Sequence, residues 1–163
     1  MSLRVGLGYD VHPFGGSGDL VLGGVTIGHA RLEGHSDADV VAHAVTDAVL
    51  GAAGLPDLGT MFPAADPHWK DASSIRFLEV AAERVAAAGW WVENVDVVVA
   101  AEVPRLAPHL EAMAANLSAA LDDVRGPSGD PVFVAVKPKR GEGIGAIGRS
   151  EGIAAWAVAL LQR

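Results

Sequence analysis

The order of apolar and polar positions along the chain first predicts strands. Residues 3–10 alternate apolar side chains with small or polar ones, which is the period of a strand. Residues 19–28 predict a hairpin that turns at Gly23-Gly24. Residues 91–101 form a Val-rich run typical of a buried strand, and residues 132–136 predict another short strand.

Helices are predicted where a capping residue precedes an apolar pattern and a glycine or a turn follows it. A loop rich in Pro, Gly and Asp over residues 55–70 separates the first two helices. Residues 151–161 fit a helix or a strand equally well, because Ala suits either face of both patterns. The first helix runs from Asp37 or Asp39 to about Ala53 before Gly54, and the second from Ser73 or Ser74 to Gly89. Pro104 and Pro108 lead into a third helix that runs to about Leu121.

The length and composition of the chain indicate one domain. Its 163 residues contain no repeat, linker or low-complexity tract, so we expect a single α+β domain over residues 1–163. Half of the residues are apolar, which favours a surface that is buried in an oligomer. The net charge of −8 argues against a nucleic-acid partner, since such proteins normally present a basic face.

The compartment and the metal chemistry are limited by three absences. No cysteine is present, so disulfides and thiolate metal sites are excluded. The longest apolar run, residues 153–161, is far too short for a membrane span. The first residues lack the basic and apolar stretches of a signal peptide. We therefore expect a cytoplasmic protein with no membrane partner.

Basic residues gather in one glycine-rich segment. Residues 137–149 carry four of the twelve cations of the chain and only one acid, Glu142. A solvated loop is the simpler explanation of such a run. Glycines that let backbone N–H groups approach, together with Lys and Arg, are more typical of a site for a phosphorylated ligand. The cations are Lys137, Lys139, Arg140 and Arg149.

Asp and His side chains recur at two places with the spacing of a shared face. Asp10 and His12 lie two residues apart at a strand end, so both point to the same side. Asp39, His43 and Asp47 follow one another at intervals of four on one face of the first helix. An Asp-His-His set with one open position is the usual composition of a catalytic zinc site.

Spacing alone leaves simpler explanations open. A single His is more often hydrogen-bonded or exposed than a metal ligand, and the helix acids also fit a solvated face. Nothing in the spacing brings His43 to Asp10 and His12. A metal enzyme with a phosphate-bearing ligand and a set of unrelated polar residues are therefore both compatible with the pattern.

Longer motifs carry a resemblance to a known family. The D-V-H of residues 10–12 and the HSDxDVxxHAxxDAxLGA block of residues 35–52 are both specific. In order and spacing the chain resembles the 2-C-methyl-D-erythritol 2,4-cyclodiphosphate synthase family, and the similar runs cover most of its length. Those runs are GLGYDVHPFGG (6–16), GHSDADVVAHAVTDAVLGAAGLPDLGTMFP (34–63), DPHWK (66–70), NVDVVVAAEVPRLAPH (94–109) and GRSEGIAAWAVALL (148–161).

The resemblance implies a reaction and an assembly. Family members convert 4-diphosphocytidyl-2-C-methyl-D-erythritol 2-phosphate to the 2,4-cyclodiphosphate and release CMP, in the non-mevalonate route to isoprenoid precursors. The 2-phosphate oxygen attacks the β-phosphorus, so the protein mainly aligns the reacting groups and neutralises charge. The family also implies a small mixed β-sheet packed against helices, assembled as a homotrimer with active sites between subunits.

The resemblance further implies the metal ligands. It assigns one zinc ion per chain to Asp10, His12 and His43, with the zinc acting as a Lewis acid at the β-phosphate. Glu142 matches the carboxylate for a second divalent cation, magnesium or manganese. The two helix acids, Asp39 and Asp47, are expected behind the ligands as groups that orient them, although support for the helix itself is an alternative for Asp47.

Other matches concern the substrate. His35 and Ser36 match a flexible pair that closes over the site, and His35 helps to stabilise the transition state. One segment of the family holds the methylerythritol hydroxyls, and two segments from the neighbouring subunit hold the nucleotide. The hydroxyl-binding segment comprises Asp57, Leu58 and Gly59 and continues from Phe62 to Asp66. The nucleotide-binding segments are residues 101–107, with Ala101, Pro104, Arg105 and Leu106, and residues 139–142, with Lys139.

Three positions depart from the family pattern. Ala64 stands where an Asp is common, which removes one substrate contact unless Asp66 replaces it. Arg140 stands in place of a Thr, and we expect it to contact the diphosphate as a catalytic group, with a solvated charge as the alternative. Ala146 replaces an aromatic residue at the trimer axis, where Arg149 is expected to meet isoprenoid diphosphates.

Two other functions stay open beside the cyclising lyase. A zinc phosphohydrolase would open the diphosphate with water, but the retained Asp57-Leu58-Gly59 motif argues against it. A catalytically drifted trimer would only bind isoprenoid diphosphates. The retained metal residues argue against drift, whereas Arg140 and Ala64 favour it slightly.

Overall fold

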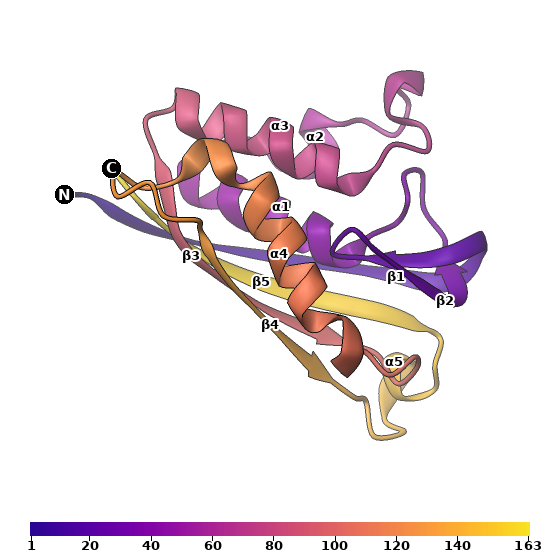
Figure 1. Cartoon of the computed structure of the whole chain (residues 1–163). Coiled ribbons are helices and arrows are strands. Elements are labelled where there is room, and N and C mark those ends of the chain that lie inside the picture. Colours follow the sequence, from indigo (N-terminus) through magenta and orange to yellow (C-terminus); the bar gives the residue numbers. More distant parts are fainter.

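The structure, a computed structural model, describes residues 1–163 apart from the side chain of His68. Within this part, five strands form one mixed sheet in the order β2-β1-β5-β3-β4, which confirms the predicted α+β class (Figure 1). Neighbouring strands are antiparallel, except that β3 and β4 are parallel. The strands are β1 (Leu3–Leu22), β2 (Val25–Leu32), β3 (Trp91–Ala100), β4 (Phe133–Lys139) and β5 (Gly152–Gln162).

The helices begin and end close to the predicted capping residues. Asp39 caps the first helix, Gly54 ends it in a left-handed conformation with φ 75°, and Ser73 precedes the second long helix. None of the described helices is both long and apolar enough to cross a membrane. The α-helices are α1 (Val40–Ala53), α2 (Leu58–Met61), α3 (Ser74–Ala87), α4 (Leu110–Ala120) and α5 (Gly145–Gly148), and the 3₁₀ turns are η1 (Pro67–Trp69), η2 (Ala107–His109) and η3 (Asp122–Val124).

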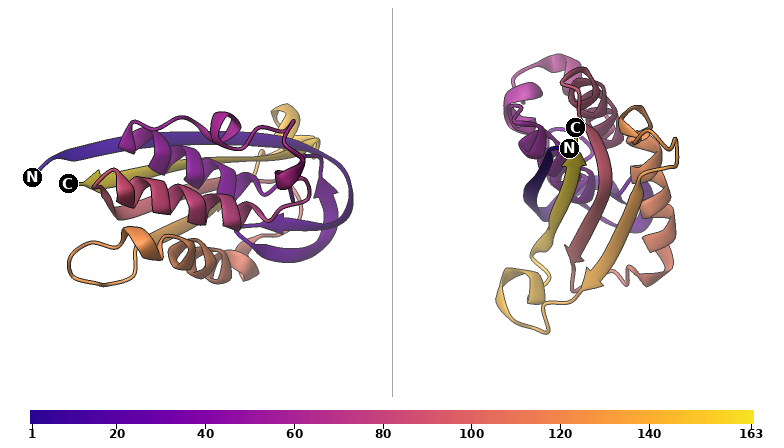
Figure 2. Two further views of the ribbon diagram at one scale, coloured as in Figure 1. Left: turned by 90° about the horizontal axis from the view of Figure 1, so that it is seen from above. Right: turned by 90° about the vertical axis from the view of Figure 1, so that its left-hand side faces the viewer.

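Strand β1 is longer than the sequence pattern predicts. It pairs with β5 as far as Pro13 and then with β2 from Phe14 to Leu22, across several irregularities in register. Gly15 and Gly18 lie in this stretch with φ of 146° and 102°, and such angles let the strand bend sharply. Figure 2 shows the resulting curl at one end of β1. One chain segment thereby joins two parts of the sheet.

Other segments confirm or refine the predictions. The hairpin is confirmed, with Leu22 paired to Val25 across the Gly23-Gly24 turn. The ambiguous segment 151–161 is a strand, because β5 lies between β1 and β3 and pairs with both. The predicted loop over residues 55–70 also contains α2 and η1, and β4 continues to Lys139.

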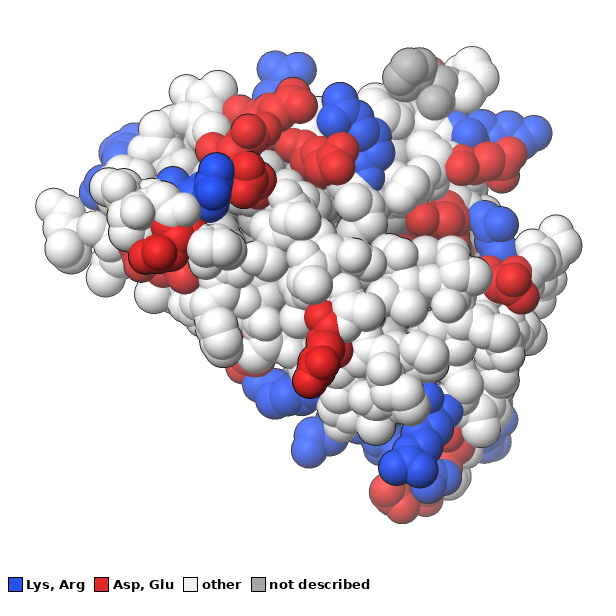
Figure 3. Space-filling model, viewed as in Figure 1, with Lys and Arg blue, Asp and Glu red and all other residues white. Residues whose placement is uncertain are grey.

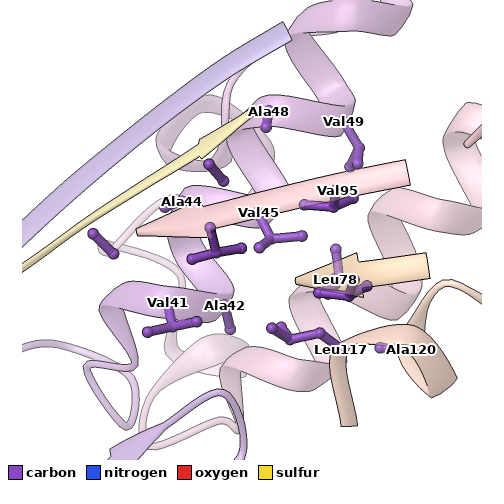
Figure 4. Close-up of a cluster of buried hydrophobic side chains, with 14 of the residues drawn as sticks. Val41, Ala42, Ala44, Val45, Ala48, Val49, Leu78, Val95, Leu117 and Ala120 are labelled. Carbon is purple, nitrogen blue, oxygen red and sulfur yellow. The ribbon is translucent and has the colours of Figure 1, made fainter. Parts of the chain in front are cut away.

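Helix α1 packs unusually closely on β1. A Cβ atom at Gly6 would lie 1.9 Å from the carbonyl oxygen of Ala48, and one at Gly8 would lie 1.8 Å from that of Ala44. Only glycine fits at both strand positions, and the small alanines of α1 allow the same approach from the helix side. Figure 4 shows the buried cluster in which the α1 side chains take part. The close packing determines where the polar end of β1 meets α1.

The opposite face of the sheet is apolar and uncovered in the single chain. Val5 and Leu7 are each 68% exposed, and Tyr9 is 50% exposed. Tyr9 pairs across the ladder with Trp156, with ring centroids 5.2 Å apart. Extended apolar surfaces of this kind are typical of contacts between proteins. We call this surface the outer apolar face; it consists of Leu3, Val5, Leu7, Tyr9, Val11, Trp156 and Val158.

Candidate metal centre and substrate clefts

Asp10, His12 and His43 meet at the end of the β1–α1 contact. A carboxylate oxygen of Asp10, Oδ2, lies 3.2 Å from Nε2 of His12 and 2.9 Å from Nδ1 of His43. The three potential ligand atoms all lie within 4.8 Å of one another, and no other such group of three occurs among the described residues. The strand period puts Asp10 and His12 on the face that α1 covers, and the close packing of α1 brings His43 to them.

The carboxylate of Asp10 and the imidazole of His12 shift each other's pKa values. Burial opposes ionisation of Asp10, but hydrogen bonds from His12 and His43, together with their charges, outweigh it and hold the pKa of Asp10 far below its usual value. The hydrogen bond to Asp10 raises the pKa of His12, against the opposing effect of burial. The cluster therefore keeps an ionised carboxylate between two imidazoles.

The remaining ring nitrogens of both histidines also have partners. Nδ1 of His12 bonds to the backbone carbonyl oxygen of Glu33. Nε2 of His43 lies 2.8 Å from Oγ of Ser74 and 3.3 Å from Oγ of Ser36. Two oriented imidazoles and one carboxylate fit the donor set of zinc with an open position, because each ring is held by its second nitrogen. The residues present thus fit a divalent metal such as zinc.

A cleft of about 290 Å³ opens beside the three residues. Among the residues expected at the substrate, His35, Ser36, Leu58, Gly59 and Phe62 line it. His35 is exposed, whereas Ser36 is buried. The departure Ala64 also lines the cleft, as do Trp69 and Phe77, which sequence reasoning did not single out.

Asp47 in α1 and Asp39, the residue that caps α1, accept hydrogen bonds from different segments. Oδ1 of Asp47 accepts a hydrogen bond of 2.7 Å from the backbone N–H of Leu58, so Asp47 holds the start of α2 at the cleft. Asp57 caps α2 by accepting from Thr60 N–H at 2.9 Å. Asp39 is fully buried and accepts from the backbone N–H groups of the Gly23-Gly24 turn and of α1. These hydrogen bonds join the hairpin to α1.

A second, larger cavity of about 580 Å³ lies between the end of β3 and the end of β4. Its lining includes the predicted nucleotide-site residues Ala101, Pro104, Arg105, Leu106 and Lys139. Glu102 and Arg140 also line it. It shares no lining residue with the cleft at the metal group, among the residues described for each.

Arg140 forms an ion pair with Glu102, a partner that sequence reasoning missed. The side chain of Glu102 is only 14% exposed, that of Arg140 is 63% exposed, and Glu102 also accepts from Gly141 N–H at 3.0 Å. The ion pair lowers the pKa of Glu102 and raises that of Arg140. Figure 3 shows basic and acidic side chains together at the lower edge of the molecule, where β4 ends and α5 lies in Figure 1.

The other predicted site residues lie outside both cavities. Glu142 is exposed, with a positive φ of 51°, and is not part of the metal group. Arg149 bonds to Glu151 at 2.6 Å and is exposed. Asp66 lies in the exposed segment before η1. Glu142 and Arg149 both belong to the chain between β4 and β5.

The fold and the Asp-His-His group together define an α+β protein with a candidate divalent-metal site beside a cleft. The chain belongs to the YgbB family, whose profile matches residues 3–162. It is 50% identical to the 2-C-methyl-D-erythritol 2,4-cyclodiphosphate synthase of Bordetella petrii, over 98% of this chain and 96% of that protein. The family expected from the motifs is therefore confirmed.

Solved structures agree with this assignment. The bifunctional IspDF of Campylobacter jejuni matches with a TM-score of 0.88 and 39% identity, over 98% of this chain and 42% of that protein. Plasmodium falciparum IspF, solved as a CDP complex, matches with a TM-score of 0.80 and 33% identity, over 98% of this chain and 95% of that protein. At these identities the likeness extends beyond the general fold.

Proposed function

We propose that this chain converts 4-diphosphocytidyl-2-C-methyl-D-erythritol 2-phosphate to 2-C-methyl-D-erythritol 2,4-cyclodiphosphate with release of CMP, as a cyclising phosphorus–oxygen lyase. The proposal rests on the meeting of Asp10, His12 and His43 beside a cleft, in a chain that matches its family from residue 3 to residue 162. The CDP complex of the Plasmodium falciparum relative supports a cytidine-bearing ligand.

The reaction requires alignment and charge neutralisation more than covalent chemistry. An oxygen of the 2-phosphate forms a bond to the β-phosphorus, while the bond from that phosphorus to the oxygen leaving with CMP breaks in line with it. Asp57, Leu58 and Gly59 hold the methylerythritol hydroxyls, and the carboxylate of Asp57 accepts from them. The hydrogen bond from Thr60 lowers the pKa of Asp57, which keeps that carboxylate ionised.

Asp10, His12 and His43 would hold a zinc ion, which would supply a Lewis acid for the phosphoryl transfer. Glu142 would hold a second cation, magnesium or manganese, because a single exposed carboxylate suits a hard ion that takes most of its ligands from elsewhere. His35 and Ser36 cover the site, and His35 stabilises the transition state.

Arg140 and Lys139 meet the nucleotide diphosphate from the second cavity. The ion pair with Glu102 holds the Arg140 guanidinium at the cavity wall, and an exposed guanidinium retains donors for phosphate oxygens. Arg149 remains the group proposed to bind an isoprenoid diphosphate at the subunit axis, where it would exchange its contact with Glu151 for one with phosphate.

The active unit is a homotrimer with sites between subunits. The outer apolar face gives each chain a large surface for a neighbouring copy. The metal cleft and the nucleotide cavity share no lining residue, which is compatible with a site that combines the cleft of one chain with the cavity of the next. Three copies related by a closed rotation are consistent with both observations.

Phosphorus NMR of the products tests the function directly. Incubation with the cytidine diphosphate substrate and a divalent cation should give CMP and a cyclic diphosphate, whose two coupled phosphorus signals differ from those of opened monophosphates. Opened products would support the phosphohydrolase instead. No turnover, combined with binding of isoprenoid diphosphates, would support the drifted trimer.

A further inference from the structure

The side of His43 that faces away from Asp10 meets a short chain of hydrogen bonds. Nε2 of His43 lies 2.8 Å from Oγ of Ser74, and that hydroxyl in turn bonds to Oδ1 of Asp37. Ser74 is fully buried and His43 is 8% exposed, so the contact between them lies away from water. None of the family motifs considered above assigns a role to Ser74 or Asp37.

The carboxylate of Asp37 determines which group is the donor in each of these hydrogen bonds. An ionised carboxylate can only accept, so the Ser74 hydroxyl gives its one proton to Asp37. The oxygen of Ser74 then accepts from Nε2–H of His43. Without a metal, Nδ1–H of His43 donates to Asp10 at 2.9 Å. A metal that replaces this proton needs the lone pair of Nδ1, and an imidazole whose proton is kept on Nε2 by Ser74 supplies it.

The residues that form these hydrogen bonds are themselves held in place. The second carboxylate oxygen of Asp37 accepts from the backbone N–H of Ser74 at 3.0 Å, and Oδ1 accepts from Asp39 N–H at 3.2 Å. Ser74 is the first residue of α3, and His43 belongs to α1, so these hydrogen bonds link two rigid helices. Oγ of Ser36 lies 3.2 Å from Oγ of Ser74 and completes the polar cluster.

We propose that Ser74 and Asp37 are positioning residues for His43, which fix its ring and its Nε2–H form so that Nδ1 offers a lone pair to a divalent metal. The inference rests on the proposed function, since the metal concerned is the zinc of Asp10, His12 and His43. Groups that orient a metal-binding imidazole in this way typically change metal affinity by about 10- to 100-fold.

Zinc affinity of the 163-residue chain tests the proposal independently of turnover. Metal-free protein is titrated with zinc against a chelating indicator, and thermal unfolding reports folding. Ser74→Ala should bind zinc about 10- to 100-fold more weakly than the unchanged chain. Asp37→Asn keeps the shape of the side chain but not its charge, and it should also weaken zinc binding. Ser74→Thr keeps the hydroxyl, and it should bind zinc almost as tightly as the unchanged chain.

The neighbouring serine provides a matched control. Ser73 is exposed and makes no side-chain capping bond, so Ser73→Ala should leave zinc affinity unchanged. Equal affinities of Ser74→Ala and Ser73→Ala would overturn the inference while leaving the metal centre intact. An unchanged chain that binds no zinc would overturn the metal centre itself, and the inference with it.

Nitrogen-15 NMR of the unchanged chain gives a second readout that needs no variant to fold. In the zinc-loaded protein, Nε2 of His43 should carry a proton, and Nδ1 should not. A His43 that binds zinc through Nε2, with its proton on Nδ1, would contradict the proposed direction of the hydrogen bonds.

Discussion

The two clefts of the chain differ in how completely one copy builds them. At Asp10, His12 and His43, every ring nitrogen has a partner within the same chain, and the supporting groups are largely buried. The cavity at Arg140 is lined by exposed cations. Arg140 is paired with an acid of the same cavity. A metal site must be preorganised, because misdirected ligands lose affinity, whereas charged groups at the cavity can adjust to a flexible ligand.

The metal group should show the largest effect of substitution. His43→Ala removes a ligand from a preorganised set, so zinc should be lost and turnover should fall by about a thousandfold or more, as expected when several kcal/mol of charge stabilisation disappear. Metal content and steady-state turnover of the purified variant measure this. Full turnover of a zinc-free His43→Ala protein would contradict the assignment of the metal site.

Mixing two inactive variants tests whether the clefts cooperate between chains. His43→Ala damages one cleft, and Glu142→Ala damages the loop that follows β4 near the other. After dissociation and random reassociation of equal amounts in a closed ring, about a quarter of the boundary sites should combine two intact halves and regain activity. Each variant mixed with itself is the control. Absence of recovery in a reassociated oligomer would indicate that each site lies within one chain.

Arg140 should show a smaller and more adjustable effect. Arg140→Ala removes a charged donor from the cavity and should slow turnover by about 10- to 1000-fold. Arg140→Thr should recover part of this loss because it restores a neutral hydroxyl donor. Glu102→Gln keeps the size of the partner and tests whether the ion pair holds the guanidinium in place. Comparison at low and high salt separates a direct contact from a solvated charge, which salt screens. Unchanged turnover in Arg140→Ala, with altered salt dependence only, would identify a solvated charge.

The stability of the metal-free protein should depend modestly on pH through the same cluster. The folded-state pKa of His12 lies above its ordinary value of 6.5, so its stabilising contribution is complete below pH 6.5 and is lost as pH rises through the raised pKa. The lowered pKa of Asp10 stabilises the fold above its ordinary value of 3.8, and that contribution is lost only as pH falls through the lowered pKa.

Thermal unfolding with and without zinc checks these signs. The metal-free chain should lose a few degrees of Tm between pH 6.5 and alkaline pH, and His12→Gln should reduce that loss. Zinc should act in the opposite direction, because its ligands must be deprotonated, so its stabilising effect rises with pH. A metal-free protein whose Tm rises steadily over this range would contradict the predicted sign for His12.

Local chemistry in the sequence determined the helix ends, the hairpin and the candidate metal ligands. Asp39, Gly54 and the Gly23-Gly24 turn act through their own backbone neighbours, so their effects follow from order along the chain. The spacing of Asp10 and His12 likewise gave them a common face. Helix spacing made His43 a candidate third ligand, and the family motifs then assigned it to the same metal as Asp10 and His12.

Only the tertiary structure decided which distant groups meet. Segment 151–161 became a strand because β1 and β3 lie on either side of it, which its alanines alone do not indicate. Glycines of β1 admit α1 so closely that His43 reaches Asp10, and α3 then brings Ser74 behind the same ring. The partner of Arg140, Glu102, lies 38 residues away along the chain. Packing between elements sets such contacts, and no local pattern carries that information.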